Sequence, residues 1–139
     1  MEIIAVATQT VAENQNVLFT DSITCGNCSI THRDGSGIVT LRGTTNQCRA
    51  RYKVSFGGNI AVPTGGTVEA ISLGLAIDGE ALGSSTMIVT PAAVEEYFNV
   101  FGAMFVDVPK DCCLTASIQN VSTQPILVQN ANLIIERVA

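Results

Sequence analysis

Charged residues are scarce in this chain. Only 14% of its 139 residues are Asp, Glu, Lys or Arg, and 7 basic residues stand against 12 acidic ones, which gives a net charge of −5. Nucleic-acid binding takes much of its affinity from Lys and Arg side chains that neutralise phosphates. Seven basic residues are too few for such a surface, and we therefore expect no nucleic-acid partner.

The sequence also lacks a targeting segment and a long hydrophobic run. Met1–Ile4 contains no positively charged segment that leads into a sustained apolar stretch, so no secretory signal peptide is predicted. Gly and Pro interrupt each uncharged stretch before it reaches the roughly 20 residues of a membrane-spanning helix. We expect a protein that is made in the cytoplasm and has no membrane partner.

Histidine occurs once, at His32, which limits the catalytic chemistry that the chain can perform. A Ser/His/Asp hydrolase needs a histidine base, and no Ser/His/Asp grouping around His32 has positional support. The tripeptide His32-Arg33-Asp34 matches the first three residues of the protein-kinase catalytic-loop motif. The motif continues with Leu, but this chain has Gly35 at that position. We expect no catalytic residue, no cofactor and no enzymatic activity.

Apolar residues are abundant, and they recur at every second position. Hydrophobic residues make up 47% of the chain and the mean hydropathy is +0.36. In residues 50–56, Ala50, Tyr52, Val54 and Phe56 alternate with polar or charged residues, the period of a β-strand. Further strands are expected over Ile3–Val11, Asn16–Phe19, Ser29–Arg33, Gly37–Leu41, Leu73–Ile77, Met87–Thr90, Phe98–Val108, Leu114–Asn120 and Ile126–Val138.

Turn signals separate these strands and complete the prediction of the fold class. Asp34-Gly35 is expected to form a hairpin turn, and only Pro91–Tyr97 has the pattern of a helical turn. Many short strands at this spacing are typical of a β-sandwich or barrel. We predict one all-β domain over residues 1–139.

Phe98–Val106 is apolar on both faces, unlike a strand that lies between a core and solvent. Val100 and Met104 lie on one face, whereas Phe101 and Phe105 lie on the other. Ile126–Val138 shows the same doubly apolar pattern. Two explanations remain open: a β-bulge that shifts the phase, or a subunit interface that covers the second face.

Three segments carry a resemblance to a known superfamily. They are Ile71–Gly79 (ISLGLAIDG), the segment VPKDCCLTASIQNVS and the closing NANLIIERVA. Together they resemble the C-terminal half of tumour-necrosis-factor-like and complement-type jelly rolls. Leu133–Ala139 is similar to the ends of bacterial collagen-like spore-surface proteins, although this chain has no Gly-X-Y stalk. The whole chain also resembles small uncharacterised or virion-associated proteins of gut Firmicutes and their phages. The resemblance implies a TNF-like two-sheet jelly-roll sandwich of about ten strands, a homotrimer and no catalysis.

Five cysteines form the main cluster of reactive side chains. They are Cys25, Cys28, Cys48, Cys112 and Cys113. Disulfide or reversible thiol pairing is the favoured interpretation, with Cys25 or Cys28 linked within the protein. Buried thiols and a thiolate metal site with His32 as a substitute ligand are the alternatives, and we predict no metal. With five cysteines, at least one stays unpaired or bonds between subunits.

Arg49, Arg51 and Lys53 share one face of a strand. They could bind an anionic ligand, but a stripe that is salt-bridged to neighbouring side chains is the favoured interpretation.

The predicted function follows from the fold and the resemblance. We expect a non-enzymatic structural protein that decorates or projects from a phage virion as a head-decoration or fibre protein. Phe101 and Phe105 are expected in the trimer interface, and phage capsid proteins are the expected partners. The alternatives are a spore-coat or cell-surface adhesion domain and a lectin-like module that binds a host-surface glycan.

Overall fold

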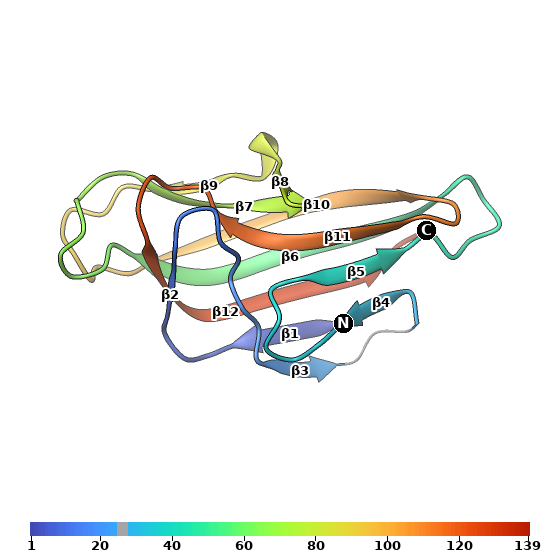
Figure 1. Cartoon of the computed structure of the whole chain (residues 1–139), viewed down its shortest axis with the longest axis horizontal. Coiled ribbons are helices and arrows are strands. Elements are labelled where there is room, and N and C mark those ends of the chain that lie inside the picture. The colour runs from blue at the N-terminus through green and yellow to red at the C-terminus, as the bar shows by residue number, and fades with distance from the viewer. Residues whose placement is uncertain (25–27) are drawn as a thin grey trace.

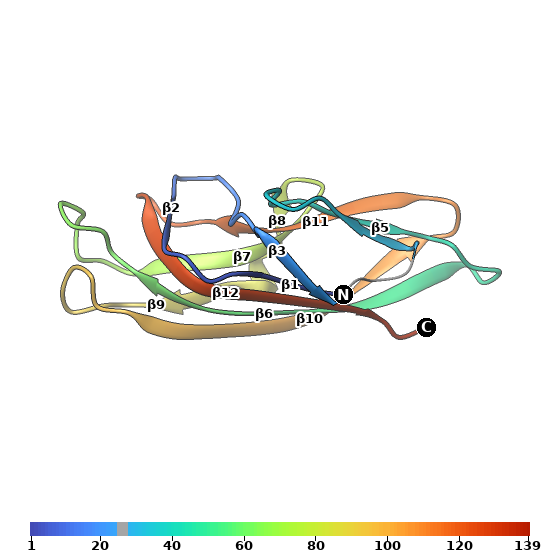
Figure 2. The ribbon, with the colours of Figure 1, turned by 90° about the horizontal axis from the view of Figure 1, so that it is seen from below.

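Two antiparallel β-sheets pack face to face in the computed structural model, which describes residues 1–24 and 28–139 (Figures 1 and 2). The strand order of sheet A is β10 (Phe98–Pro109), β6 (Arg49–Ala61), β12 (Ile126–Arg137), β1 (Glu2–Ala5) and β3 (Asp21–Thr24), and β2 (Gln9–Val11) also pairs with β12. The order of sheet B is β4 (Ile30–His32), β5 (Val39–Arg42), β11 (Cys113–Asn120), β7 (Ile71–Ile77) and β8 (Glu80–Ala81), and β9 (Met87–Val89) also pairs with β7.

The chain crosses repeatedly between the two sheets. The strands β6, β10 and β12 belong to sheet A, whereas β7 and β11, which come between them in the sequence, belong to sheet B. The described residues contain no α-helix, and one 3₁₀ turn lies at Gly83–Ser85. The predicted all-β jelly-roll sandwich is therefore confirmed, with twelve strands in the described part of the chain where about ten were expected.

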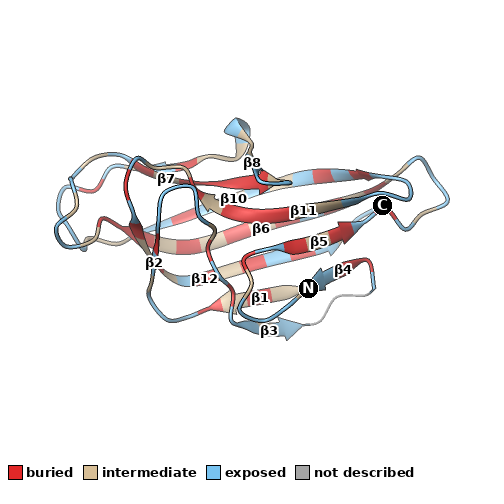
Figure 3. Ribbon diagram, viewed as in Figure 1, coloured by how far each residue is buried: buried red, intermediate tan, exposed pale blue. Residues whose placement is uncertain are grey.

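Buried residues alternate with less buried ones along the long strands (Figure 3). Successive side chains of a strand point to opposite faces of its sheet, so the buried ones form a core between the two sheets. In β6, Ala50, Tyr52, Val54 and Phe56 are all buried, as the alternation predicted. The ring of Phe56 meets that of Phe19 edge to face, with centroids 6.4 Å apart. Burial of such side chains supplies most of the driving force for folding, at about 1.5 to 3 kcal/mol each.

The strand expected at Asn16–Phe19 does not form. Val17 and Phe19 are fully buried, but their backbone N–H groups donate to the carbonyls of Ile118 and Ser36 and join no ladder. Asn16 makes only an isolated bridge to Gln119. The apolar pattern of this segment predicted burial correctly but not the hydrogen-bond partners, which are distant in sequence.

The helical turn expected at Pro91–Tyr97 is also wrong. Glu95 has a φ of +56°, which a right-handed helix cannot contain, and its N–H donates to the carbonyl of Val62 at 2.7 Å. This long-range hydrogen bond replaces the local ones that a helical turn would have made.

The two doubly apolar strands have different explanations. The register between β12 and β6 shifts between Gln129 and Asn132, with Asn130 at a φ of +53°, so a bulge accounts for the pattern in β12. In contrast, β10 pairs with β6 in unbroken register from Phe98 to Pro109. A bulge is therefore the wrong explanation for β10. This strand is regular and carries apolar residues on both of its faces.

Candidate functional site

The outward face of β10 carries two aromatic rings in contact with solvent. The residues Phe101 and Phe105 are 68% and 60% exposed, whereas Val100 and Val106 on the inward face are buried. Phe101 lies opposite Gly57 of β6, and its Cδ2 atom is 3.8 Å from the position that a Cβ at Gly57 would take. The single chain thus leaves both side chains largely exposed to solvent, as the strand parity predicted.

Register extends this apolar area across three strands. Ala103 of β10 pairs with Ser55 of β6, which pairs with Ile134 of β12. Ile134 is 41% exposed, whereas Leu133 and Ile135 beside it are buried. We call the exposed set Phe101, Ala103, Phe105 and Ile134 the aromatic face.

The aromatic face lies on an edge strand. β10 is the outermost strand of sheet A, and no backbone hydrogen bond joins it to β9 of the other sheet within the described residues. A twelve-residue edge that is this apolar readily associates with another chain unless something covers it.

Charged groups border the aromatic face at one end. Asp107 accepts hydrogen bonds from the Nε atoms of Arg51 at 2.7 Å and of Arg49 at 3.1 Å. The guanidinium of Arg51 also lies over the ring of Phe105, with Cζ 5.9 Å from the centroid. The predicted salt-bridged stripe is confirmed for Arg49 and Arg51. The hydrogen bond from Arg51 lowers the pKa of Asp107, and the same contact raises the pKa of Arg51.

Replacement of Arg51 by Gln should raise the pKa of Asp107 towards its ordinary value, because the strongest hydrogen bond to the carboxylate and the nearest positive charge are lost. A carboxyl whose pKa is depressed in the folded state stabilises the fold above its unfolded pKa, and this contribution is lost as the pH falls through the folded pKa. Carbon-13 NMR titration of the Asp107 carboxyl measures the change. Lys53→Gln on the same face is the control, and an equal rise in both variants would contradict the assignment to Arg51.

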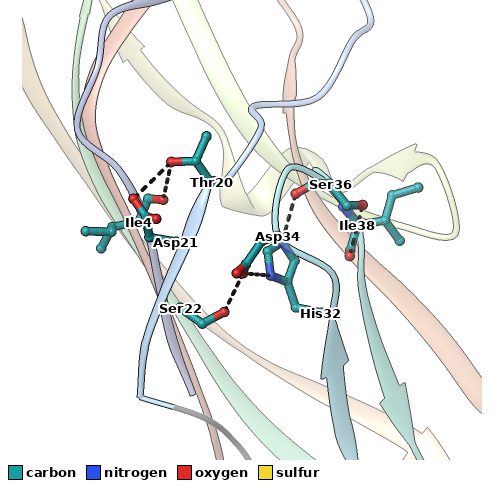
Figure 4. A network of polar contacts seen from close by, with 8 residues as sticks. All are labelled: Ile4, Thr20, Asp21, Ser22, His32, Asp34, Ser36 and Ile38. Carbon is teal, nitrogen blue, oxygen red and sulfur yellow. Dashed lines mark hydrogen bonds and ion pairs between the residues drawn. The ribbon is translucent and has the colours of Figure 1, made fainter.

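The stretch that includes His32 forms the β4–β5 hairpin of sheet B, and the turn of this hairpin contacts β3 of sheet A (Figure 4). The side chain of His32 is fully buried, and its Nε2 lies 2.8 Å from the carbonyl oxygen of Ser36, so Nε2 carries the proton. Its Nδ1 has no hydrogen-bond partner among the residues that the structure describes and lies 3.8 Å from Asp34 Oδ1. Asp34 in turn accepts a hydrogen bond from Ser22 of β3 at 2.8 Å.

This geometry does not suit hydrolytic catalysis. The Ser22 hydroxyl bonds to Asp34 and not to the imidazole, so His32 is not placed to take a proton from it. The ring of His32 packs edge to face against the buried Phe19, with centroids 6.5 Å apart. The network holds the Asp34-Gly35 turn against β3, and the predicted hairpin is confirmed.

The predicted cysteine cluster is only partly described. Cys28, Cys48, Cys112 and Cys113 are exposed and carry free thiols, so the buried-thiol alternative is wrong for these four. Cys25 lies outside the described residues, and the predicted link through it stays a prediction. Within residues 1–24 and 28–139, no three His, Cys, Asp or Glu side chains are grouped as metal ligands.

Sequence reasoning found Phe101 and Phe105 but missed Ile134. The bulge at 129–132 reverses the parity of β12, and a strand read without its pairing partners does not show such a reversal. The run Leu133-Ile134-Ile135 is uniformly apolar, so no signal in the sequence marks Ile134 as the residue that points outward.

Comparisons with known proteins bear on the fold. No protein-family model matches the sequence, and no curated protein matches it. The globular domain of zebrafish complement 1qA protein is similar in structure, with a TM-score of 0.62 and 13% identity over 96% of this chain and 93% of that one. This likeness supports the jelly-roll fold and shows nothing beyond the fold.

Two weaker similarities are to sugar-binding modules. The EclA C-terminal domain, a sugar-binding protein, has a TM-score of 0.36 and 15% identity over 81% of this chain and 89% of that one. CBM35 from Cellvibrio japonicus Abf62 has a TM-score of 0.41 and 7% identity over 100% of this chain and 98% of that one. With TM-scores below 0.5, they carry no information about the function of this chain.

Proposed function

We propose that this chain is a non-enzymatic structural module that assembles as a homotrimer through the aromatic face and decorates or projects from a phage virion. The observation that carries the proposal is the exposed pair Phe101 and Phe105 on the regular edge strand β10. The resemblance to TNF-like and complement-type jelly rolls supports a trimer in preference to other assemblies.

The distribution of charge on sheet A favours burial of this face. The apolar residues lie in the middle of the outward face of sheet A. Asp107 lies at one end of this face, where it forms ion pairs with Arg49 and Arg51. An interface centred on Phe101 would bury aromatic and aliphatic surface and keep Arg49, Arg51 and Asp107 at its rim. Lys53, which lies opposite Phe105 and beside Glu136 of β12, is exposed and would have to stay in contact with water at the rim or pair with an acidic group. Aromatic residues, Phe among them, are enriched at the centres of protein–protein interfaces.

A role on a particle surface is consistent with the remaining features. No helix in the described part of the chain is long and apolar enough to cross a membrane. The acidic net charge of −5 does not favour contact with packaged nucleic acid. A single small domain suits a protein that is added to a preformed shell.

Mass spectrometry of particles purified from a host strain that carries this gene tests the virion role. The chain should co-purify with capsid proteins in a fixed ratio and in multiples of three per attachment site. Recovery from washed spores or cell envelopes, with none in the virions, would contradict the virion role and favour the spore-coat or adhesion alternative.

A further inference from the structure

All four described cysteines lie at one end of the sandwich, which we call the thiol end. Cys28 precedes β4 and Cys48 precedes β6, whereas Cys112 lies in the turn after β10 and Cys113 is the first residue of β11. Figure 1 shows the β5–β6 loop, the β10–β11 turn and the C-terminus at this same end. All four side chains are exposed.

Backbone hydrogen bonds hold these cysteines in place. The Cys112 carbonyl accepts the N–H of Gly43 at 2.8 Å, and the Cys112 N–H donates to the carbonyl of Pro109 at 3.0 Å. The Cys48 carbonyl accepts the N–H of Lys110 at 3.0 Å. The thiols are therefore presented on a hydrogen-bonded framework and not on a free tail.

The sheet keeps the thiols of β4 and β11 apart. Cys113 pairs with Arg42 of β5, and Arg42 N–H donates to the carbonyl of Ser29 on the opposite side of β5. Cys28 and Cys112 therefore flank the end of β5, two inter-strand spacings or about 9.5 Å apart. A disulfide rarely joins Cα atoms separated by more than about 7 Å.

A bond between Cys112 and Cys113 is also disfavoured. Adjacent Cα atoms are about 3.8 Å apart, below the range of about 4.4 to 6.8 Å that disulfides adopt. The register places Arg42, not a cysteine, across from Cys113 on β5. The odd count of five cysteines also leaves at least one thiol without a partner in its own chain.

The two adjacent thiols line an open groove. This groove has a volume of about 160 Å³, and its other lining residues are Arg42, Gly43, Thr44 and Asp111. Arg42 is held there by hydrogen bonds from Nη1 to Thr31 Oγ1 at 2.7 Å and to the Cys28 carbonyl at 3.1 Å. A partner sulfur can reach Cys112 and Cys113 through this groove.

We propose that Cys112 and Cys113 form an intermolecular disulfide-exchange site that joins the chain covalently to a disulfide-bearing partner. The proposal does not rest on the trimer, because the thiol end is complete within one chain. The disulfide can come from a low-mass compound or from a second, oxidised copy of the chain.

The exchange balances without any further oxidant. The thiolate sulfur of Cys112 or Cys113 attacks one sulfur of the partner disulfide, and the S–S bond of the partner breaks. The electron pair of that bond leaves with the second partner sulfur, which takes up the proton released by the cysteine. A new S–S bond joins the cysteine to the attacked sulfur, and the partner disulfide is the oxidant.

The test is to incubate the folded full-length protein with oxidised glutathione, quench with acid and measure intact mass without reduction. We expect a glutathione adduct or a covalent dimer, mapped by peptide analysis to Cys112 or Cys113. A dimer identifies a second copy as the partner source, and an adduct without dimer identifies the low-mass source. Circular dichroism of each sample establishes that the protein is folded.

Two variants complete the design. Cys112→Ser with Cys113→Ser should lose the product, whereas the matched control Cys48→Ser should keep it. If the double variant fails to fold, the site is decided by peptide mapping of the wild type alone. A wild-type product that maps only to other cysteines, or a disulfide within one chain with no intermolecular product, would overturn the proposal.

Discussion

Phe101→Asp should convert the protein from a trimer to a monomer at micromolar concentration. Phe101 is 68% exposed in the single chain, and each ring removed from water stabilises an assembly by about 2 to 3 kcal/mol. The substitution removes three such rings from a threefold interface and places three carboxylates in a dry environment, which costs further free energy. Native mass spectrometry measures the change in oligomeric state.

Ile38→Asp provides the matched control. Ile38 is also exposed, at 46%, but it immediately precedes β5 of sheet B, away from the aromatic face. This variant carries the same added charge and should remain a trimer. A wild-type protein that is a soluble monomer at micromolar concentration would contradict the proposed interface and the trimer that the resemblance implies.

Strict alternation made the aromatic face of β10 predictable. The strand pairs with β6 without interruption, so the parity of Phe101 and Phe105 follows directly from their positions. Ile134 belongs to the same face, but its parity depends on the bulge in β12, which is visible only through the register with β6. The alternation of residues in the sequence thus predicts which side chains point outward in a regular strand. It fails where a bulge shifts the alternation by one residue.

Hydrogen bonds between distant residues account for the two mistaken elements. The N–H of Phe19 donates to Ser36, and that of Glu95 donates to Val62, so neither segment completes its local pattern. Hydrophobicity predicted that Phe19 would be buried but carried no information about which carbonyl would accept its N–H. Backbone groups must find partners, and tertiary contacts decide which partners are available.

Topology also explains why the thiol end could not be located in advance. Cys28, Cys48 and Cys112 are far apart in the sequence, and each precedes a strand that starts at the same end of the sandwich. The cysteine count and the C-x-x-C spacing indicated thiol chemistry, but they did not show that Cys112 and Cys28 flank β5.

Gly43→Ala should lower the free energy of unfolding by about 3 kcal/mol, because overpacking and the loss of backbone hydrogen bonds act together at this position. A Cβ at Gly43 would overlap the carbonyl oxygen of Pro109 and lie 2.9 Å from its carbonyl carbon. Both are backbone atoms of the β10–β11 turn, so no side-chain rotation relieves the clash. The Gly43 N–H also donates to Cys112, and its carbonyl accepts the N–H of Asp111 at 3.1 Å.

Urea unfolding followed by circular dichroism measures this loss, with Gly83→Ala as the matched control. Gly83 has no atom within 4 Å of the position of an added Cβ, so its substitution should change the stability by less than about 0.5 kcal/mol. Because the clash moves the turn that carries Cys112 and Cys113, Gly43→Ala should also alter the rate of glutathione exchange, whereas Gly83→Ala should not. Equal free energies of unfolding for the two variants would show that the backbone at Pro109 can shift to make room for the added Cβ. The hydrogen bonds of Gly43 would then not hold the thiol end rigidly.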